Sequence, residues 1–230
     1  MKITLIHGQN HRGSTYHIAR MATEKIGGDI DEFFLPRDFS AMCTGCFACM
    51  NKGMEHCPHG AQVGPIFESM LAADVIVIGS PTYVLEMTGQ LKCFFDHLFG
   101  AWLSHSPREA MFSKTGIVVS TAAGAGMKGV AKSLAKQLFY LGVPKVYRIA
   151  VRAAAMSWDE VNARTKEKIN AWIDKIVGKI NRTSAKAKPG LKLRFMFMMM
   201  RQMQKANNWA PLDKKHWEDM QWLDKARPWK

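Results

Sequence analysis

The sequence predicts a doubly wound α/β fold, a parallel sheet with helices on both faces. Short apolar, β-branched runs alternate with helix-like segments along residues 1–180, as parallel strands joined by crossover helices require. The run at residues 74–79 is continuously apolar after its first residue, which is typical of a central strand buried on both faces. Loops of small or polar residues follow three of the strands. The 230 residues suffice for one such domain and an appendage.

The elements follow from local signals taken in order. Gly27 and Gly28 end the first helix, and Pro36 ends the second strand. Pro65 is expected in the first turn of its helix, where proline is tolerated, and Ser157–Glu160 has the spacing of a capping box that opens the long last helix. We expect strands at residues 3–6, 31–35, 74–79, 114–120 and 146–151, and helices at residues 15–26, 65–71, 89–99, 130–141 and 157–180.

Five such strands fit the flavodoxin-like order 2-1-3-4-5. Ligands of these sheets bind beyond the carboxyl ends of the strands, at the switch point of the topology. The loops after the first, third and fourth strands should therefore converge on one ligand. A dinucleotide-binding Rossmann sheet is less favoured, because no G-x-G-x-x-G follows the first strand and no acidic residue clearly ends the second.

The first loop has the character of an anion site. A buried strand runs into residues 7–14, which include Gly8 and Gly13, and a helix follows from about Thr15. The first amides of a helix lack internal partners, and the helix dipole adds partial positive charge there. Arg12 can add a full charge. The alternative is an ordinary strand–loop–helix connection, because a loop with Gly and Ser is a weak signal by itself.

The sequence indicates the cellular compartment in which the protein functions. The sequence has no early stretch with the features of a signal peptide and no apolar run long enough for a membrane span, so we expect a cytoplasmic protein. Five cysteines, three of them spaced two residues apart, do not form a secreted disulfide framework. They indicate metal or redox chemistry in a reducing compartment.

Three motifs together resemble a known family. They are the loop Gly8–Thr15, the motif Cys43-Thr-Gly-Cys46-Phe-Ala-Cys49 and the segment Gly79–Tyr83. In combination they resemble the NADPH-dependent FMN reductases and the related iron–sulfur flavoproteins, over residues 1 to about 180. The resemblance implies a flavodoxin-like fold and an FMN-dependent oxidoreductase. Electrons would pass from NADPH or NADH through the flavin to a small-molecule acceptor such as a quinone, a free flavin, a nitro or azo compound, or a metal.

The resemblance also implies site residues. The FMN phosphate would lie in the first loop, formed by Gln9, Asn10, His11, Arg12, Gly13, Ser14 and Thr15. The edge of the isoalloxazine ring would pass Pro81, Thr82, Tyr83 and Val84, and its other side would meet Thr121, Ala122, Gly124 and Gly126. No side chain, His7 included, is expected to be catalytic, because the chemistry occurs on the flavin. The sequence departs from the family at Gln9, where serine is common, and at His11, where proline-lysine-like pairs are common.

The spacing of the cysteines is compatible with several kinds of site. Cys43, Cys46, Cys49 and Cys57, with a proline after the last, have spacing similar to ferredoxin-type ligation. Iron–sulfur flavoproteins carry a 4Fe–4S cluster near the flavin, so the resemblance implies a possible cluster here, and with it an electron carrier or redox sensor as the alternative function. Zinc, with His56 or His59 as alternative ligands, and thiols that hold no metal are the other readings. Cys93 is expected in the core.

Residues 181–230 form a basic extension, rich in Met and Trp, that we separate from the domain at 1–180. Of the net charge of +13, +8 falls in this extension. Residues 182–189 are expected to be a linker. The apolar run 195–200 is too short to span a bilayer; it could lie on an anionic membrane surface or pack on a second subunit, and we favour packing within a homodimer or tetramer. Trp209, Trp217, Trp222 and Trp229 suggest docking on a partner subunit or the flavin-site rim. No nucleic-acid-binding module is present.

Overall fold

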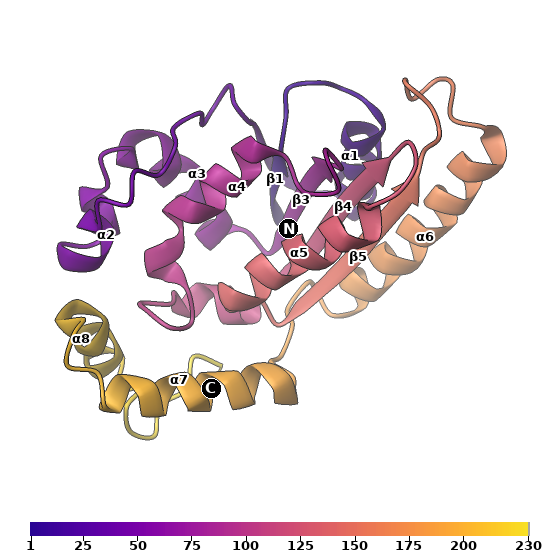
Figure 1. The fold of residues 1–230 in the computed structure, drawn as a ribbon. Helices are drawn as coiled ribbons and strands as arrows, with labels where there is room; N and C mark the ends of the chain where they lie inside the picture. Colours follow the sequence, from indigo (N-terminus) through magenta and orange to yellow (C-terminus); the bar gives the residue numbers. More distant parts are fainter. Residues whose placement is uncertain (230) are drawn as a thin grey trace.

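A computed structural model describes residues 1–229, and its centre is a five-stranded sheet. All four strand pairs are parallel, and the order is β2-β1-β3-β4-β5, which confirms the predicted topology (Figure 1). The strands are β1 (Lys2–His7), β2 (Asp29–Phe34), β3 (Val75–Pro81), β4 (Thr115–Ala122) and β5 (Lys145–Arg152). β1 and β3 are adjacent. The chain leaves β1 toward β2 on one side and leaves β3 toward β4 on the other, so the switch point of the topology lies between β1 and β3.

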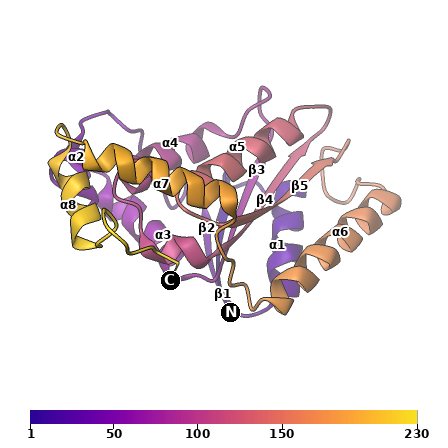
Figure 2. The ribbon, with the colours of Figure 1, turned by 90° about the horizontal axis from the view of Figure 1, so that it is seen from below.

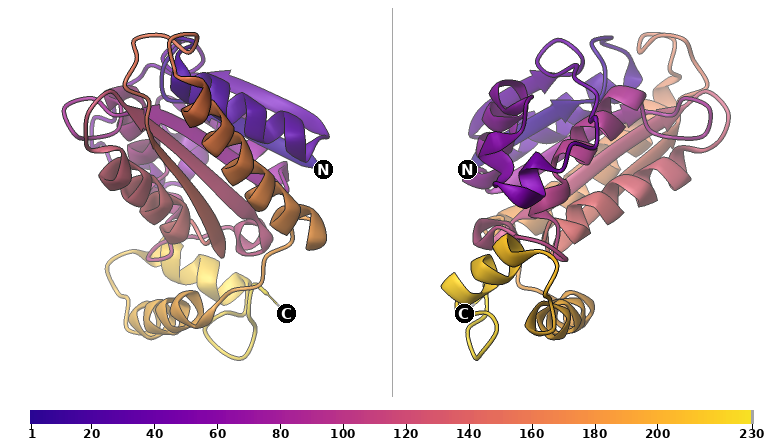
Figure 3. Two further views of the ribbon diagram at one scale, coloured as in Figure 1. Left: turned by 90° about the vertical axis from the view of Figure 1, so that its right-hand side faces the viewer. Right: turned by 60° about the vertical axis from the view of Figure 1, so that its left-hand side comes forward.

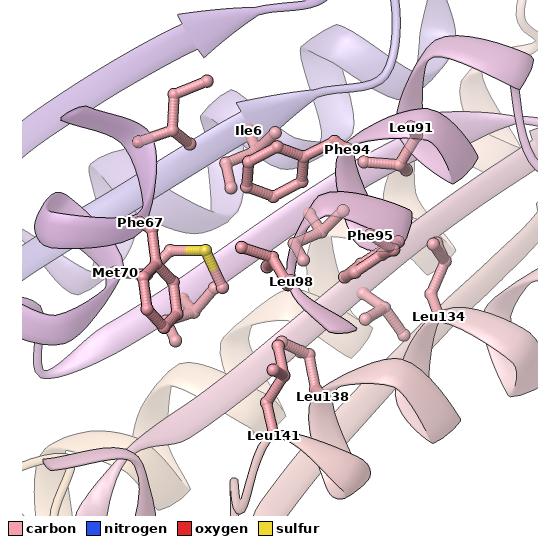
Figure 4. Close-up of a cluster of buried hydrophobic side chains, with 14 of the residues drawn as sticks. Ile6, Phe67, Met70, Leu91, Phe94, Phe95, Leu98, Leu134, Leu138 and Leu141 are labelled. Atoms are coloured by element: carbon pink, nitrogen blue, oxygen red, sulfur yellow. The ribbon is translucent and has the colours of Figure 1, made fainter. Parts of the chain in front are cut away.

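Helices cover both faces of the sheet, each over its own apolar core. On one face lie α1 (Ser14–Ile26) and α6 (Ala163–Arg182). On the other lie α3 (Gly60–Ala72), α4 (Gly89–His97) and α5 (Met127–Tyr140). The core under the second set contains Phe67, Phe94 and Leu134, drawn in Figure 4. Inward-facing residues recur every three or four positions along these helices, which is why the sequence pattern located them.

Two helix starts differ from the sequence-based expectation. Pro65 does not open its helix, because α3 begins at Gly60 and carries the proline inside. The capping box at Ser157–Glu160 is also wrong, because α6 begins at Ala163 and Asn162 is its N-cap, accepting a 2.8 Å hydrogen bond from the Thr165 amide. An asparagine oxygen caps a helix as well as serine does, so the later cap competes with the earlier one.

The connection from β2 to α3 contains the cysteine segment. It includes α2 (Ala48–Asn51) and the 3-10 turn η1 (Met54–His56). Two further 3-10 turns follow α4, at η2 (Phe99–Ala101) and η3 (Glu109–Ser113). The three turns pack against α2, α3 and α4.

The C-terminal extension forms two helices, α7 (Leu191–Lys205) and α8 (Pro211–Asp219), which pack below the sheet (Figures 2 and 3). Trp217 and Trp222 are fully buried in a third core with Phe197 and Phe112. The extension therefore docks on its own chain near the amino ends of β4 and β5. The expectation that these tryptophans dock on a partner subunit or the flavin-site rim was wrong. No helix among residues 1–229 is long and apolar enough to cross a bilayer.

A buried polar cluster fastens α8 to the domain. His105 Nδ1 lies 2.8 Å from Asp213 Oδ2, and the Ser106 hydroxyl donates to Asp213 Oδ1 at 2.9 Å. The Trp217 indole N–H donates to the His105 carbonyl at 2.6 Å. Each polar group in the cluster thereby has a partner, as burial requires.

Candidate functional site

Three loops meet beyond the carboxyl ends of β1, β3 and β4, and side-chain hydrogen bonds join them. The hydroxyls of Thr15 and Thr121 lie 2.7 Å apart and join the start of α1 to the end of β4. The Tyr83 hydroxyl donates to Gln9 Oε1 at 2.7 Å and joins the second loop to the first. The Thr82 amide donates to the Thr121 carbonyl at 2.8 Å. The convergence predicted from the topology is therefore present.

The amino end of α1 provides unused amides at this place. Gly13 is the N-cap in an extended conformation, and no side chain caps the helix. The first intrahelical bond is from the His17 amide to the Gly13 carbonyl at 3.1 Å. The amides of residues 14–16 precede it and have no intrahelical acceptor. Together with the helix dipole they form a site for an anion such as a phosphate.

The polar residues of the first loop are divided between this site and solvent. The Arg12 guanidinium is exposed and lies 5.5 Å from the centre of the Tyr16 ring. His11 folds back, so that a Cβ added at Gly13 would meet its ring at 2.8 Å. Asn10 is exposed. Gln9, Ser14 and Thr15 are the residues of the loop that are partly or fully buried beside Gly13.

Close approach of neighbouring side chains to the backbone explains why two positions in these loops are glycine. A Cβ at Gly8 would lie 2.7 Å from Thr88 Oγ1, and one at Gly126 would lie 2.8 Å from Thr82 Cγ2. Gly126 also has φ of +93°, which favours glycine. At Gly124, by contrast, nothing lies within 4 Å of an added Cβ. The glycines at 8 and 126 hold the loops together, and the backbone at 124 is open to a flat ligand.

A tight turn between β3 and α4 presents two apolar side chains to solvent. Tyr83 and Glu86 exchange backbone hydrogen bonds of 2.9 and 3.0 Å. The two residues between them, Val84 and Leu85, have φ of +50° and +66° and are 98% and 66% exposed. A β-branched residue at positive φ is a backbone outlier, and such strain is concentrated at functional sites. Leu85 was not among the predicted site residues, because nothing in its sequence context marks it.

His7 ends β1 beside the first loop, and its side chain pairs with β2. Its Nε2 lies 2.8 Å from Glu32 Oε1, and its ring stacks on Phe34 with centroids 4.5 Å apart. Burial lowers the pKa of His7 below its ordinary value, although Glu32 opposes the shift. The ring belongs to the packing of β1 against β2, and it also lies 5.0 Å from the Tyr16 ring of α1.

The four motif cysteines gather around one small hollow. Cys43, Cys46, Cys49 and Cys57 all line it, together with His59 and His97. Burial raises the pKa of the Cys49 thiol, and the neighbouring Cys57 and Cys43 raise it further. A bound cation would reverse this effect and stabilise the thiolates. The donor set of four soft sulfur atoms fits an iron–sulfur cluster or zinc.

Two histidines complete the hollow. The ligand atoms of Cys57, His59 and His97 lie within 4.8 Å of one another. His97 Nδ1 donates to the Cys93 carbonyl at 2.7 Å, which leaves its Nε2 to accept from His59 Nδ1 at 2.8 Å. His56 instead lies 3.3 Å from Glu55. Sequence reasoning named His59 but missed His97, which comes from α4 and is 38 positions away.

The cysteine hollow is separate from the three loops. It packs against the carboxyl end of α4, at His97, whereas the Tyr83–Glu86 turn precedes the amino end of the same helix. The structure therefore brings the cysteines together along α4, from Lys92 to His97, while the three loops meet before the amino end of that helix.

Comparison with known proteins gives matches that cover the part of the chain containing both sets. A family model described as NADPH-dependent FMN reductase matches residues 1–157. An iron–sulfur flavoprotein from Methanosarcina thermophila is 31% identical over 100 residues, which is 42% of this chain and 51% of the relative. Another, from Archaeoglobus fulgidus, is 32% identical over 99 residues, 42% of this chain and 48% of the relative. The chain spans about half the length of these curated relatives.

Solved structures share the fold at low identity. An azoreductase from Bacillus anthracis superposes with a TM-score of 0.56 at 16% identity, over 79% of this chain and all of that one. An NADH:FMN oxidoreductase in its apo form superposes with a TM-score of 0.52 at 18% identity, over 77% and 88%. At such identities these neighbours establish the architecture alone.

Proposed function

The chain belongs to the NADPH-dependent FMN reductase family, and from this premise we propose that it is an FMN-dependent oxidoreductase that uses NADPH or NADH as electron donor. The observation that carries the proposal is the junction of three loops at the open amino end of α1. A phosphate-bearing flat cofactor needs an anion site next to an exposed backbone edge, and this junction offers both.

Each part of the junction has a role in binding the cofactor. The amides of residues 14–16 and the Arg12 guanidinium would hold the phosphate. The Tyr83 hydroxyl is oriented by Gln9, and the Thr15–Thr121 pair keeps the loops at a fixed spacing. The Val84–Leu85 turn and the open backbone at Gly124 would border the ring. When bound, FMN supplies reversible acceptance of a hydride, and the protein supplies position and electrostatics.

The proposal is tested by the purified protein itself. We expect it to bind FMN and to show the two visible bands of a flavin. NADPH or NADH added anaerobically should bleach those bands, and an electron acceptor should restore them. A protein that binds no FMN after reconstitution contradicts the proposal. Steady-state rates with a quinone, a free flavin, a nitro compound, an azo dye and ferric iron then identify the acceptor class.

The phosphate end can be tested separately, because riboflavin lacks the phosphate. Arg12→Gln should weaken FMN binding by about fivefold, the loss of one charge-assisted contact, and leave riboflavin binding unchanged. Arg182→Gln is the matched control, since Arg182 is exposed at the carboxyl end of α6 and donates to the Gly178 carbonyl of its own helix. An equal loss of both ligands would mean that Arg12 does not contact the phosphate.

A second candidate function rests on the cysteine hollow. With a 4Fe–4S cluster on Cys43, Cys46, Cys49 and Cys57, the protein would serve as an electron carrier or redox sensor. Iron and acid-labile sulfide in protein prepared anaerobically should then approach four of each per chain, and Cys49→Ser should abolish both. Cys93→Ser is the control, because Cys93 lies on α4 outside the motif. Absence of iron and sulfide removes this candidate.

A further inference from the structure

Helix α7 has two apolar faces, and only one of them is used by the fold. Leu193 and Phe197 point inward and are buried in the third core. Turned by half a revolution are Leu191, Phe195, Met198 and Met199, which recur at helical spacing on the opposite side. Their side chains are 86%, 65%, 51% and 47% exposed. We refer to these four residues as the outer stripe.

The outer stripe faces away from the rest of the molecule. Seen from below, α7 runs along the near side of the chain with α5 behind it (Figure 2). In the end-on view of Figure 3 the helix lies at the lower margin, with the sheet above it. The exposed fractions of the four side chains show that packing of this chain leaves the outer stripe uncovered. Exposed apolar residues gathered on one helix face mark an interaction surface, whereas scattered ones do not.

The charged residues near the outer stripe indicate which kind of partner it would bind. Lys192, Arg194 and Lys205 are exposed on α7. From Arg182 to Leu212 the sequence contains seven Lys or Arg residues and no Asp or Glu. An apolar stripe with exposed cations beside it, on a helix that has no carboxylate of its own, is the pattern of a helix that lies in the interface of a membrane with anionic lipids.

The same charges disfavour pairing with a second copy through this face. In a two-fold symmetric dimer each patch meets itself. The cations beside one stripe would then face identical cations, and α7 has no acidic residue that could neutralise them. Like charges across an interface oppose association. This reverses the preference drawn from the sequence, which could not show that the stripe lies outward.

From these observations we propose that α7 docks the protein on an anionic phospholipid surface, with the outer stripe in the acyl–headgroup boundary and the lysines and arginines at the phosphates. The docking is peripheral. It is independent of the flavin, because the extension packs near the amino ends of β4 and β5 and the three loops lie beyond the carboxyl ends.

Sedimentation of the full chain with vesicles tests the proposal. The vesicles are phosphatidylcholine alone or phosphatidylcholine with about one third phosphatidylglycerol. We expect binding to the anionic vesicles, at least about tenfold weaker binding to the neutral ones, and loss of binding as salt shortens the screening length. No binding to the anionic vesicles overturns the proposal, and so does equal binding to both kinds.

Two sets of variants identify the surface. Phe195→Ser combined with Met198→Ser and Met199→Ser should lower partitioning at least about tenfold, whereas Met156→Ser, at a site 87% exposed on another loop, should leave it unchanged. Arg194→Gln with Lys205→Gln should lower it about twenty-five-fold, at about fivefold per cation. The matched control is Lys168→Gln with Lys175→Gln, two exposed positions on α6.

Two further readouts keep the result unambiguous. Thermal unfolding of the triple serine variant should match that of the parent, because the changed side chains are outside the core. The mass of the vesicle-free protein in solution should be the same for both. If the variant instead converts an oligomer to a smaller species, α7 is an interface between protein chains and the membrane proposal is wrong. Vesicle binding does not depend on FMN, so a protein that failed to bind FMN would still give a valid result in this test.

Discussion

The hydroxyls of Thr15 and Thr121 are 2.7 Å apart, although 106 positions separate them in the sequence. Both side chains are buried. Thr15 is in the first turn of α1 and Thr121 is near the end of β4, so their bond joins the two sides of the candidate site. Each hydroxyl can satisfy the other, which makes the pair sensitive to the loss of either partner.

Thr121→Val should therefore loosen the junction. The change leaves the Thr15 hydroxyl buried without its partner, at a cost of about 1–3 kcal/mol, and we expect FMN affinity to fall about tenfold. Thr23→Val is the control, because Thr23 is a buried residue of α1 whose hydroxyl bonds only to helix carbonyls. Flavin fluorescence titration measures affinity, and urea denaturation measures stability. Equal FMN affinities for the two variants would contradict the prediction.

The strained turn at Val84 and Leu85 should be stabilised by residues that tolerate positive φ. Val84→Asn with Leu85→Gly supplies the pair that such two-residue turns favour. Relief of strain should raise the unfolding free energy by about 1–2 kcal/mol, measured as a higher thermal midpoint. The same double change removes the exposed apolar side chains, so FMN binding should weaken even as stability rises. A fall in stability would show that the turn is not strained.

Stability should decrease as the pH falls below about 6.5, the ordinary pKa of histidine. Burial lowers the folded-state pKa of both His7 and His216. The unfolded chain therefore binds protons more readily than the folded one, and acidification favours unfolding between the unfolded and folded pKa values. His7→Gln should reduce the slope of unfolding free energy against pH in this window. An unchanged slope in this variant would contradict the prediction.

Two aspartates of α8 make a matched comparison. Asp213 is buried against His105, whereas Asp219 is exposed against Lys215. Asp213→Asn breaks a buried pair and should lower the unfolding free energy by about 3 kcal/mol. Asp219→Asn should cost less than about 0.5 kcal/mol. Similar effects of the two changes, measured by denaturant unfolding, would mean that the extension is not fastened by the buried cluster.

The sheet could be predicted because its signals are local. The residues at 75–78 are apolar and mostly β-branched without interruption, and the helices between strands repeat apolar residues at helical spacing. Strand order then followed from the topology rules and the matching of three loops. The errors at Pro65 and Ser157 concern helix ends, where several local signals compete and neighbouring residues decide the outcome.

The parts that could not be predicted depend on contacts between distant segments. His97 joins the cysteines only because α4 lies beside the β2–α3 connection. Leu85 adopts positive φ although neither it nor Val84 favours that conformation. The direction of the stripe on α7 depends on which side Phe197 and Trp217 use for packing. Composition revealed an amphipathic tail but not its orientation.

The placement of the extension separates the surface proposed to bind membranes from the loops proposed to bind the flavin. The outer face of α7 is exposed, and the extension packs near the amino ends of β4 and β5, whereas the proposed flavin loops lie beyond the carboxyl ends of the strands. Selection could thus adjust where the protein resides without altering the chemistry it performs, and could retune the chemistry without moving the protein. Among related proteins, substitutions in the outer stripe should therefore occur independently of substitutions at Thr15, Tyr83 and Thr121.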